Sequence, residues 1–323
     1  MFMIRLPVFL VYGMRKFTKG GYEKASKNFN PEDLTVDLKG KHIMVTGGNQ
    51  GIGFSAAMKL AALGATVHLV CRNAEKGKEA VERIKAETRN PNIHLHLCDV
   101  SSLQDIRRLA KDYQKSDLPL HVLINNAGVM VNPVQSADGY EINFATNTLG
   151  SYAVTRALES VLKSSAPSRV IFVSSGGSLT ESLVTDDLEG DRLKKDDNFG
   201  QIQYARDKRR QVVIAEQLAK EFASSQVLVC SMHPGWCDTF GVVSSMPSFH
   251  ERFKDSLRAP DEGADTIVWL SVKNADHLEA GGFYLDRATQ SKHLPLAGTG
   301  YTREDAETLM KKLETLAKPA VPT

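Results

Sequence analysis

The sequence predicts an α/β protein built on a single doubly wound parallel sheet with helices on both faces. From Gly40 onward, short and continuously apolar runs alternate with helical segments, and a glycine-rich turn directly follows the first run. Strands that are apolar throughout and separated by helices are typical of parallel strands buried on both faces. We find no internal repeat and no low-complexity tract, so we expect one domain with tails.

Each expected element follows from its pattern. Apolar runs of strand length lie at residues 42–46, 66–71, 93–98, 121–125, 169–174, 227–232 and 282–285. Helical periodicity covers residues 53–64, 74–88, 103–113, 148–163, 203–222 and 261–272. A final amphipathic helix is predicted at 302–317, with Thr302 as its N-cap and Asp305 in the capping-box position. We expect residues 15–39, 181–200 and 246–260 to be flexible surface segments.

Composition excludes several classes of protein. The 323 residues are 42% hydrophobic and 24% charged, which is ordinary for a globular domain and excludes disordered and collagen-like chains. A formal charge of +2 offers no basic surface for nucleic acid, so we expect no nucleic-acid partner. The four cysteines lie far apart without metal-ligand or redox spacing, which predicts reduced thiols and no metal site.

The N-terminal segment allows two interpretations. Residues 1–14 are mostly apolar and are followed by a basic cluster, Arg15, Lys16, Lys19, Lys24 and Lys27. This pattern fits a short interfacial anchor held to anionic headgroups through residues 1–27, and it fits equally a helix that docks on the protein itself. Without a signal cleavage site or a glycosylation acceptor, we expect a cytoplasmic or cytosol-facing membrane-associated protein that is not secreted.

A dinucleotide-binding turn is predicted between the first strand and the first helix. Glycines in such a turn let the backbone approach a pyrophosphate, and the helix N-terminus supplies amide donors. We therefore expect a Rossmann-type domain over residues 40–290, between an N-terminal extension (1–39) and a C-terminal extension (291–323). The expected nucleotide-binding residues of the turn are Thr46, Gly47, Asn49, Gln50, Gly51, Ile52 and Gly53.

Residues at the ends of the next strands refine the cofactor. Arg72 ends the second strand, where a fold that prefers NAD would carry an acidic residue for the ribose hydroxyls. An arginine suits a 2′-phosphate, so NADP(H) is favoured over NAD(H). We also expect the cofactor site to include Asp99 and Val100 after the third strand, and Asn126, Ala127 and Gly128 after the fourth.

A tyrosine and a lysine four residues apart form a candidate catalytic pair. Tyr204 and Lys208 lie on a predicted helix, where positions four apart share a face. A phenol with its usual pKa of about 10 is a poor base at neutral pH unless a cation lowers that pKa. Lys208 is such a cation, so the pair could transfer a proton.

Together these residues resemble the short-chain dehydrogenase/reductase family over roughly residues 40–287, in its retinol-dehydrogenase-like branch. The matching motifs are 46–53, Asp99, 125–128, Asn147, Ser174-Ser175, Tyr204 with Lys208, and Pro234-Gly235 with Thr239. The branch is indicated by the phrases HLVCR at 68–72 and YARDK at 204–208. The spacer between Ser175 and Tyr204 is longer than in the wider family, which fits a surface excursion.

The resemblance implies a role for each residue. Tyr204 would be the general acid/base, and Lys208 would bind the nicotinamide ribose and lower the tyrosine pKa. Ser175 would hydrogen-bond the reacting oxygen, with Ser174 as an alternative, and Asn147 would hold a water behind Lys208. The nicotinamide end would be lined by Pro234, Gly235 and Thr239.

These roles predict an NADP(H)-dependent oxidoreductase that interconverts a hydrophobic alcohol and its carbonyl. The apolar stretch after Pro234 would either cover the substrate or simply pack on the body: Trp236, Phe240, Val242, Val243, Met246, Phe249 and Phe253. The alternative function is a non-catalytic NADP(H)-binding sensor or scaffold that retains the catalytic residues. A retinoid, a steroid and a fatty aldehyde are equally compatible substrates, and relatives often form dimers or tetramers through helices of this core.

Overall fold

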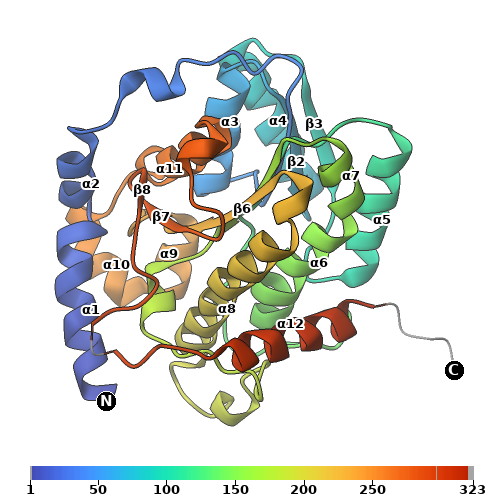
Figure 1. Cartoon of the computed structure of the whole chain (residues 1–323). Helices are drawn as coiled ribbons and strands as arrows, with labels where there is room; N and C mark the ends of the chain where they lie inside the picture. The colour runs from blue at the N-terminus through green and yellow to red at the C-terminus, as the bar shows by residue number, and fades with distance from the viewer. Residues whose placement is uncertain (1, 296, 319–323) are drawn as a thin grey trace, which may run out of the picture.

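A mostly parallel sheet organises the chain, which a computed structural model describes over residues 2–295 and 297–318 (Figure 1). The strand order is β3-β2-β1-β4-β5-β6-β7-β8. The strands are β1 (His42–Thr46), β2 (Thr66–Cys71), β3 (Ile93–Leu97), β4 (Val122–Asn125), β5 (Ser168–Val173), β6 (Val227–Met232), β7 (Phe283–Leu285) and β8 (Ala288–Thr289). The predicted doubly wound α/β sheet is confirmed, although β8 pairs antiparallel with β7 and was not predicted.

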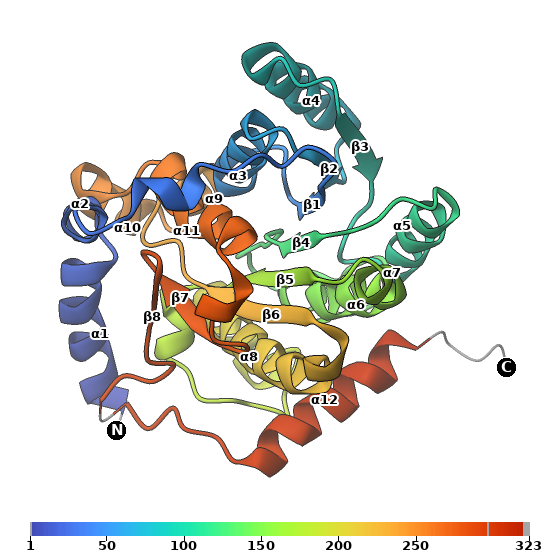
Figure 2. The ribbon, with the colours of Figure 1, turned by 45° about the horizontal axis from the view of Figure 1, so that its top comes forward.

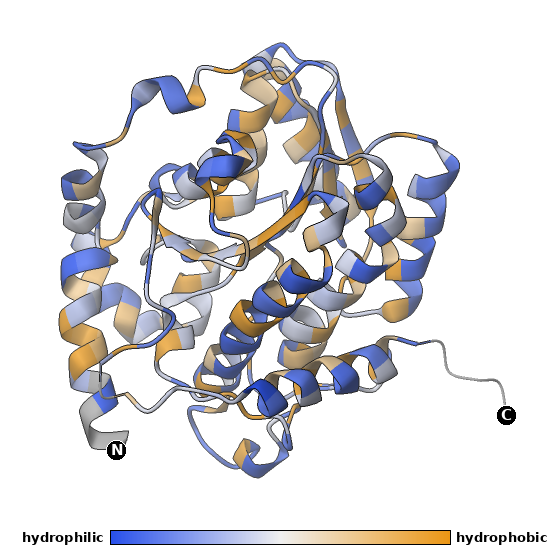
Figure 3. Ribbon diagram, viewed as in Figure 1, coloured by the Kyte–Doolittle hydropathy of each residue, from blue (hydrophilic) through white to orange (hydrophobic). Residues whose placement is uncertain are grey.

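Helices cover both faces of the sheet (Figure 2). One face carries α3 (Gly51–Ala62), α4 (Ala74–Thr88) and α11 (Pro260–Val272), and the other carries α5 (Leu103–Lys115), α6 (Ser151–Ala157), α7 (Glu159–Ser164), α8 (Phe199–Glu221) and α12 (Arg303–Ala317). Neighbouring residues in β1 belong to opposite cores, since Met44 packs with the second group and Val45 with the first. The strand β6, which lies in the middle of the view, is accordingly coloured as hydrophobic in Figure 3.

Of three further predicted elements, one agrees with the structure and two differ from it. The single helix expected at 148–163 is a π-helical turn, η2 (Phe144–Gly150), followed by α6 and α7. The predicted C-terminal helix begins as expected, with Thr302 as N-cap and Asp305 completing the capping box. The segment after β6, whose second half was expected to be flexible, forms α9 (Phe240–Ser245) and α10 (Pro247–Phe253).

The N-terminal extension packs on the rest of the protein. It forms α1 (Phe2–Lys16), α2 (Lys19–Ser26) and the 3-10 turn η1 (Pro31–Leu34), and Figures 1 and 2 both place α1 beside β8. The Phe9 ring lies 6.2 Å from the Trp236 ring, and Asp33 accepts a 2.8 Å hydrogen bond from Trp269. α1 is therefore a helix that docks on the protein itself. Residues 15–39, which we expected to be flexible, also contact the rest of the chain. Within the described residues, no helix is both long and apolar enough to cross a bilayer.

Candidate active site

A cleft of about 570 Å³ opens at the carboxyl ends of the parallel strands, where α/β folds bind their ligands. Most of the predicted site residues line it: Gly47, Asn49, Gln50, Gly51, Ile52, Gly53, Arg72, Asp99, Val100, Asn126, Ala127, Gly128, Tyr204, Lys208, Pro234 and Thr239. The other predicted residues, Thr46, Asn147, Ser175 and Gly235, lie outside this lining and influence it through the contacts described below.

The glycine-rich turn leaves backbone donors at the cleft. Gln50 is the N-cap of α3 but makes no side-chain capping bond, so the first amide groups of the helix lack a side-chain partner. Gly47 has a φ of +66°, and a Cβ on Gly53 would collide with the Asn126 amide. Only glycine allows this close approach, and the free amides at a helix N-terminus fit an anionic phosphate group.

Thr46 braces this turn from beneath. Its side chain is buried, and its hydroxyl accepts hydrogen bonds from the backbone amides of Asn126 and Ala127, both at 3.0 Å. The Asn126 side-chain amide in turn donates a 2.9 Å hydrogen bond to the Thr46 carbonyl. Through its hydroxyl, Thr46, which we expected in the nucleotide site, fixes the turn to the end of β4.

Two cations lie at the end of the cleft formed by β2 and α4. Arg72 is largely exposed, with a guanidinium nitrogen 3.7 Å from the Asp99 carboxylate. Lys76 lines the same end of the cleft, in the first turn of α4. The sequence analysis missed Lys76, although a cation in the first turn of the helix that follows Arg72 was a usable signal. The pair suits a dianionic phosphate group.

Tyr204 lies on α8 at the other end of the cleft. Burial raises the pKa of Tyr204 to about 12, and a hydrogen bond from the Ser175 side chain acts in the opposite direction. The neighbouring Ser174 hydroxyl donates instead to the Lys208 carbonyl at 2.7 Å. Since the Ser174 hydroxyl is occupied, the geometry favours Ser175 as the serine that works with Tyr204.

Lys208 is buried beneath the tyrosine. Its ammonium nitrogen lies 5.3 Å from the centre of the Tyr204 ring and donates to the Val173 carbonyl at 2.7 Å. Burial lowers the pKa of Lys208 to about 7, with the nearby Asp207 opposing that shift. The expected lowering of the Tyr204 pKa is therefore not found, because burial disfavours charge on both partners.

Asn147 and Gln211 complete the polar support behind Lys208. The Asn147 side chain pairs with both backbone groups of Val129, at 2.9 and 2.8 Å. The main-chain carbonyl of Asn147, the residue that the resemblance expects to hold a water, accepts from the Gln211 side-chain amide nitrogen at 2.7 Å. The Gln211 amide oxygen accepts from Lys208 at 3.0 Å. Gln211 was missed in the sequence because its place depends on η2 and α8 coming together.

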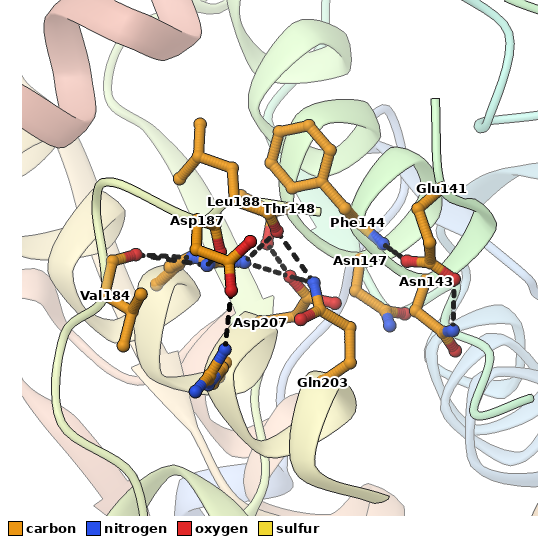
Figure 4. A network of polar contacts seen from close by, with 12 residues as sticks. Glu141, Asn143, Phe144, Asn147, Thr148, Val184, Asp187, Leu188, Gln203 and Asp207 are labelled. Carbon is orange, nitrogen blue, oxygen red and sulfur yellow. Dashed lines mark hydrogen bonds and ion pairs between the residues drawn. The ribbon is translucent and has the colours of Figure 1, made fainter. Parts of the chain in front are cut away.

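A buried ion pair ties α8 to the excursion before it (Figure 4). Asp207 and Arg210 are fully buried and 2.8 Å apart. Thr148 donates to the Asp207 carboxylate at 2.6 Å, while Arg210 donates to the carbonyls of Val184, Asp187 and Leu188. The segment that we expected to be flexible is therefore held by three of its carbonyls against the helix that carries Tyr204.

Comparisons with known proteins agree with this geometry. Residues 41–185 match the family model described as short chain dehydrogenase. Dehydrogenase/reductase SDR family member 12 of Homo sapiens is 44% identical over 320 residues, which are 98% of this chain and 99% of that protein. Retinol dehydrogenase 11 of Mus musculus is 34% identical over 254 residues, covering 78% of this chain and 79% of the relative.

Solved structures share the architecture. The Pseudomonas aeruginosa RhlG/NADP active-site complex has a TM-score of 0.63 at 23% identity, covering 79% of this chain and 96% of its own. The short chain dehydrogenase from Shigella flexneri also has a TM-score of 0.63 at 23% identity, covering 81% and 96%. Stretches around Tyr22, 46–49, 173–177 and 232–236 further resemble SDR family member 12. The chain belongs to the short-chain dehydrogenase/reductase family.

Proposed function

We propose that this chain is an NADP(H)-dependent oxidoreductase that interconverts a hydrophobic alcohol and its carbonyl. The observation that carries the proposal is the arrangement of a single cleft. A glycine-rich turn with free helix amides and Arg72 lie at one end of it, and Tyr204 with Ser175 and Lys208 lies at the other. A dinucleotide bound in this cleft would place its phosphates on the turn and its reactive ring beside the tyrosine.

The chain's own residues would handle the proton and the developing charge. The bound nicotinamide would supply or accept the hydride at the substrate carbon. Tyr204 would give its phenolic proton to the substrate oxygen during reduction and take one from the hydroxyl during oxidation. Ser175 would donate a hydrogen bond to that oxygen. A phenolate at Tyr204 favours a protonated Lys208, so these two groups would titrate as a coupled pair.

The preference for NADP(H) rests on charge. Arg72 and Lys76 place two cations where a 2′-phosphate would lie, and the Asp99 carboxylate lies 3.7 Å from Arg72. The structurally similar RhlG was solved with NADP, which supports the same preference. Exposed guanidinium and ammonium groups gain more from a dianionic phosphate than from neutral ribose hydroxyls.

Apolar walls support a lipophilic substrate. The lining of the cleft includes the apolar side chains of Met130, Val131, Val242 and Met246. Apolar pockets with a few polar groups are typical of sites for hydrophobic small molecules. The names of the related retinol dehydrogenases point to the same class of substrate.

Peripheral contact with a cytosol-facing membrane surface remains part of the proposal. The outer face of α1 exposes Val11 and Met14, beside the exposed basic residues Arg15, Lys16 and Lys19. An apolar strip with flanking cations suits an interface with anionic headgroups. The docked inner face of α1 leaves this outer face available.

The proposal is tested by titrating the purified protein with NADPH and NADH while following nucleotide fluorescence. We expect NADPH to bind at least about tenfold more tightly, because one charge-assisted contact contributes on the order of 1.5–3 kcal/mol. Arg72→Asp should abolish that preference, and Arg89→Asp, at the far end of α4, should keep it. Tyr204→Phe should retain NADPH binding but lower turnover of accepted carbonyls at least about a hundredfold.

Each outcome has a clear meaning. Absence of binding to either nucleotide would refute the proposed function. Tight NADPH binding without turnover across a broad set of alcohols and carbonyls would favour the alternative, a non-catalytic sensor or scaffold. Unchanged turnover in Tyr204→Phe would show that another group transfers the proton.

A further inference from the structure

Arg258 joins three parts of the chain that lie far apart in the sequence. Its side chain is 1% exposed and donates two hydrogen bonds to Asp286, in the turn between β7 and β8, at 2.6 and 2.9 Å. It also donates to the carbonyls of Lys16 at 2.6 Å, Thr18 at 3.2 Å and Pro234 at 3.3 Å. The N-terminal extension, the segment after β6 and the sheet edge therefore meet at one guanidinium group.

The guanidinium lies directly against the segment that borders the cleft. Gly235 has a φ of +87°, and a Cβ at that position would collide with the Arg258 side chain. The backbones also pair, since Arg258 donates to the Trp236 carbonyl at 2.7 Å and accepts from the Asp238 amide at 2.8 Å. The path of residues 234–238 is thus determined by Arg258 on one side.

The N-terminal extension determines the same path on the other side. The Phe17 carbonyl accepts from the Trp236 amide at 2.8 Å, and the Phe17 ring packs edge-on to His233 with 4.3 Å between ring centres. Gly13 lies so close to the Trp236 ring that a Cβ would come within 2.5 Å of it. The backbone and the side chain of Trp236 are therefore both held by α1 and the residue that follows it.

The far end of this segment reaches across the cleft. A Cβ on Gly51, at the start of α3, would lie 3.6 Å from the Thr239 methyl group, which is ordinary contact distance. Pro234 and Thr239 both line the cleft. A shift of residues 234–239 would therefore change the width of the cleft between the start of α3 and Tyr204, whereas Arg72 and Lys76 are carried by the end of β2 and by α4.

We propose that Arg258 is a positioning residue for the cofactor. Residues 13–18 of the N-terminal extension act with it, and together they fix residues 234–239, the segment that receives the nicotinamide half of the dinucleotide. This inference rests on the proposed function, because it assumes that the cleft binds NADPH. It assigns the N-terminal extension to the active site, in addition to any contact with a membrane. If α1 served only as a membrane anchor, its removal would leave cofactor binding intact. Because α1 contacts Trp236, we expect instead that displacement of α1 weakens the binding of NADPH.

The test compares NADPH with 2′,5′-ADP, which carries the adenosine half and both of its phosphates but no nicotinamide. We expect Arg258→Lys to weaken NADPH binding about tenfold, because lysine cannot reproduce the paired bonds to Asp286. The affinity for 2′,5′-ADP should change less than twofold. Arg287→Lys is the matched control, since Arg287 also donates two hydrogen bonds to a buried aspartate, Asp265, and one to the Asn30 carbonyl. It should leave both affinities unchanged.

A pair of glycine variants tests the N-terminal part separately. Gly13→Ala should displace α1 from Trp236 and weaken NADPH binding without affecting 2′,5′-ADP. Gly20→Ala should have no effect, because a Cβ at Gly20 meets nothing within 4 Å. This pair also tests the inference if Arg258→Lys does not fold. Thermal unfolding of each variant shows whether that variant is folded.

The outcomes separate this inference from the proposed function. The inference would be overturned if a variant bound NADPH and 2′,5′-ADP equally more weakly, or if NADPH binding were unchanged in Arg258→Lys or in Gly13→Ala. The proposed function would still stand. Wild-type protein that binds neither NADPH nor 2′,5′-ADP would overturn both. Selective loss of NADPH binding in the two variants is the expected result.

Discussion

The Gln211 side chain is held in one orientation by its neighbours. Its amide oxygen accepts from Lys208, and its amide nitrogen donates to the Asn147 carbonyl. The reversed side chain would place two donors against each other at Lys208 and two acceptors against each other at Asn147, so the network selects the observed orientation. A water could relay a proton by exchanging its roles, but an amide cannot. We therefore expect the proton used by Tyr204 to arrive from the cleft.

Substitution of Gln211 should move the pH dependence of turnover. Burial lowers the pKa of Lys208 to about 7. In the proposed mechanism the charged lysine supports Tyr204, so turnover should fall as the pH rises through this pKa. Gln211→Ala removes a hydrogen-bond acceptor and should shift that limb about one pH unit lower, which corresponds to about 1.4 kcal/mol. Gln211→Glu adds a negative charge beside the ammonium and should shift the limb higher.

The measurement is a pH profile of kcat for both variants on any accepted carbonyl. A loss of activity that is the same at every pH would indicate a purely structural role. The opposite signs of the two shifts are what the geometry of Lys208 and Gln211 requires.

At the scale of elements, a row of histidines crosses β1, β2 and β3. The His68 ring hydrogen-bonds to His42 at 3.1 Å and to His96 at 2.9 Å, with the Tyr113 hydroxyl 3.5 Å away and the His94 ring stacked at 5.2 Å. Burial lowers the pKa of His68 to about 2, and the neighbouring histidines contribute in the same direction. Over the described residues, no group of three or more such side chains is arranged to hold a metal ion.

This row predicts that acid destabilises the fold. His68 stays neutral in the native state and gains a proton below about pH 6.5 when unfolded, so its contribution is complete above that pH and is lost as the pH falls. Between pH 6.5 and pH 5, His68 alone should lower the free energy of unfolding by about 2 kcal/mol. Urea unfolding at pH 7 and pH 5 measures this difference.

The matched variants are His68→Gln and His277→Gln. The first removes the buried ring and should flatten the pH dependence, whereas the second changes an exposed histidine and should leave it unaltered. An unchanged dependence in His68→Gln would assign the acid sensitivity to other groups.

The sequence predicts elements well where one pattern controls them. The central strands are found because each apolar run is buried on both faces, and α12 is found because its capping box and periodicity agree. β8 escapes prediction because it has two residues, both exposed. The π-helical turn η2 also escapes, because a shift of hydrogen-bond partners leaves the apolar periodicity nearly unchanged.

The same distinction applies to the site. The glycine-rich turn and the Tyr204–Lys208 pair are local motifs, so the sequence indicates them directly. Gln211 and Arg258 act through segments that only the folded chain brings together, and no spacing rule identifies them. Whether Thr46 binds a ligand or braces the turn is likewise a matter of tertiary contacts, because its hydroxyl partners lie at the end of β4.

At the scale of the whole molecule, the C-terminal extension covers part of the helical core. α12 packs against α8 and η2, and its Leu309 and Leu313 are completely buried. The two-residue β8 and α1 lie along the β7 edge of the sheet. The extension therefore covers an apolar surface of α8 and η2 that, if exposed, would favour association with another copy.

We therefore expect the protein to be monomeric at micromolar concentrations. Leu309→Asp should displace α12, because an unpaired carboxylate is costly in an apolar interface, and should produce larger species. Glu307→Gln, on the exposed side of the same helix, should remain monomeric. Sedimentation velocity distinguishes these cases, and a wild-type dimer would contradict the expectation.

The contact between Arg258 and Lys16 also determines when the molecule can be completed. The two residues are 242 positions apart. At a synthesis rate of about 5–20 residues per second, Lys16 leaves the ribosome on the order of 10–50 s before its partner is made. During that interval the aromatic face of α1 has no Trp236 to cover it. α1 is therefore made early but is among the last segments to reach its place, and a chain released before residue 258 lacks the guanidinium group that we propose positions the cofactor segment.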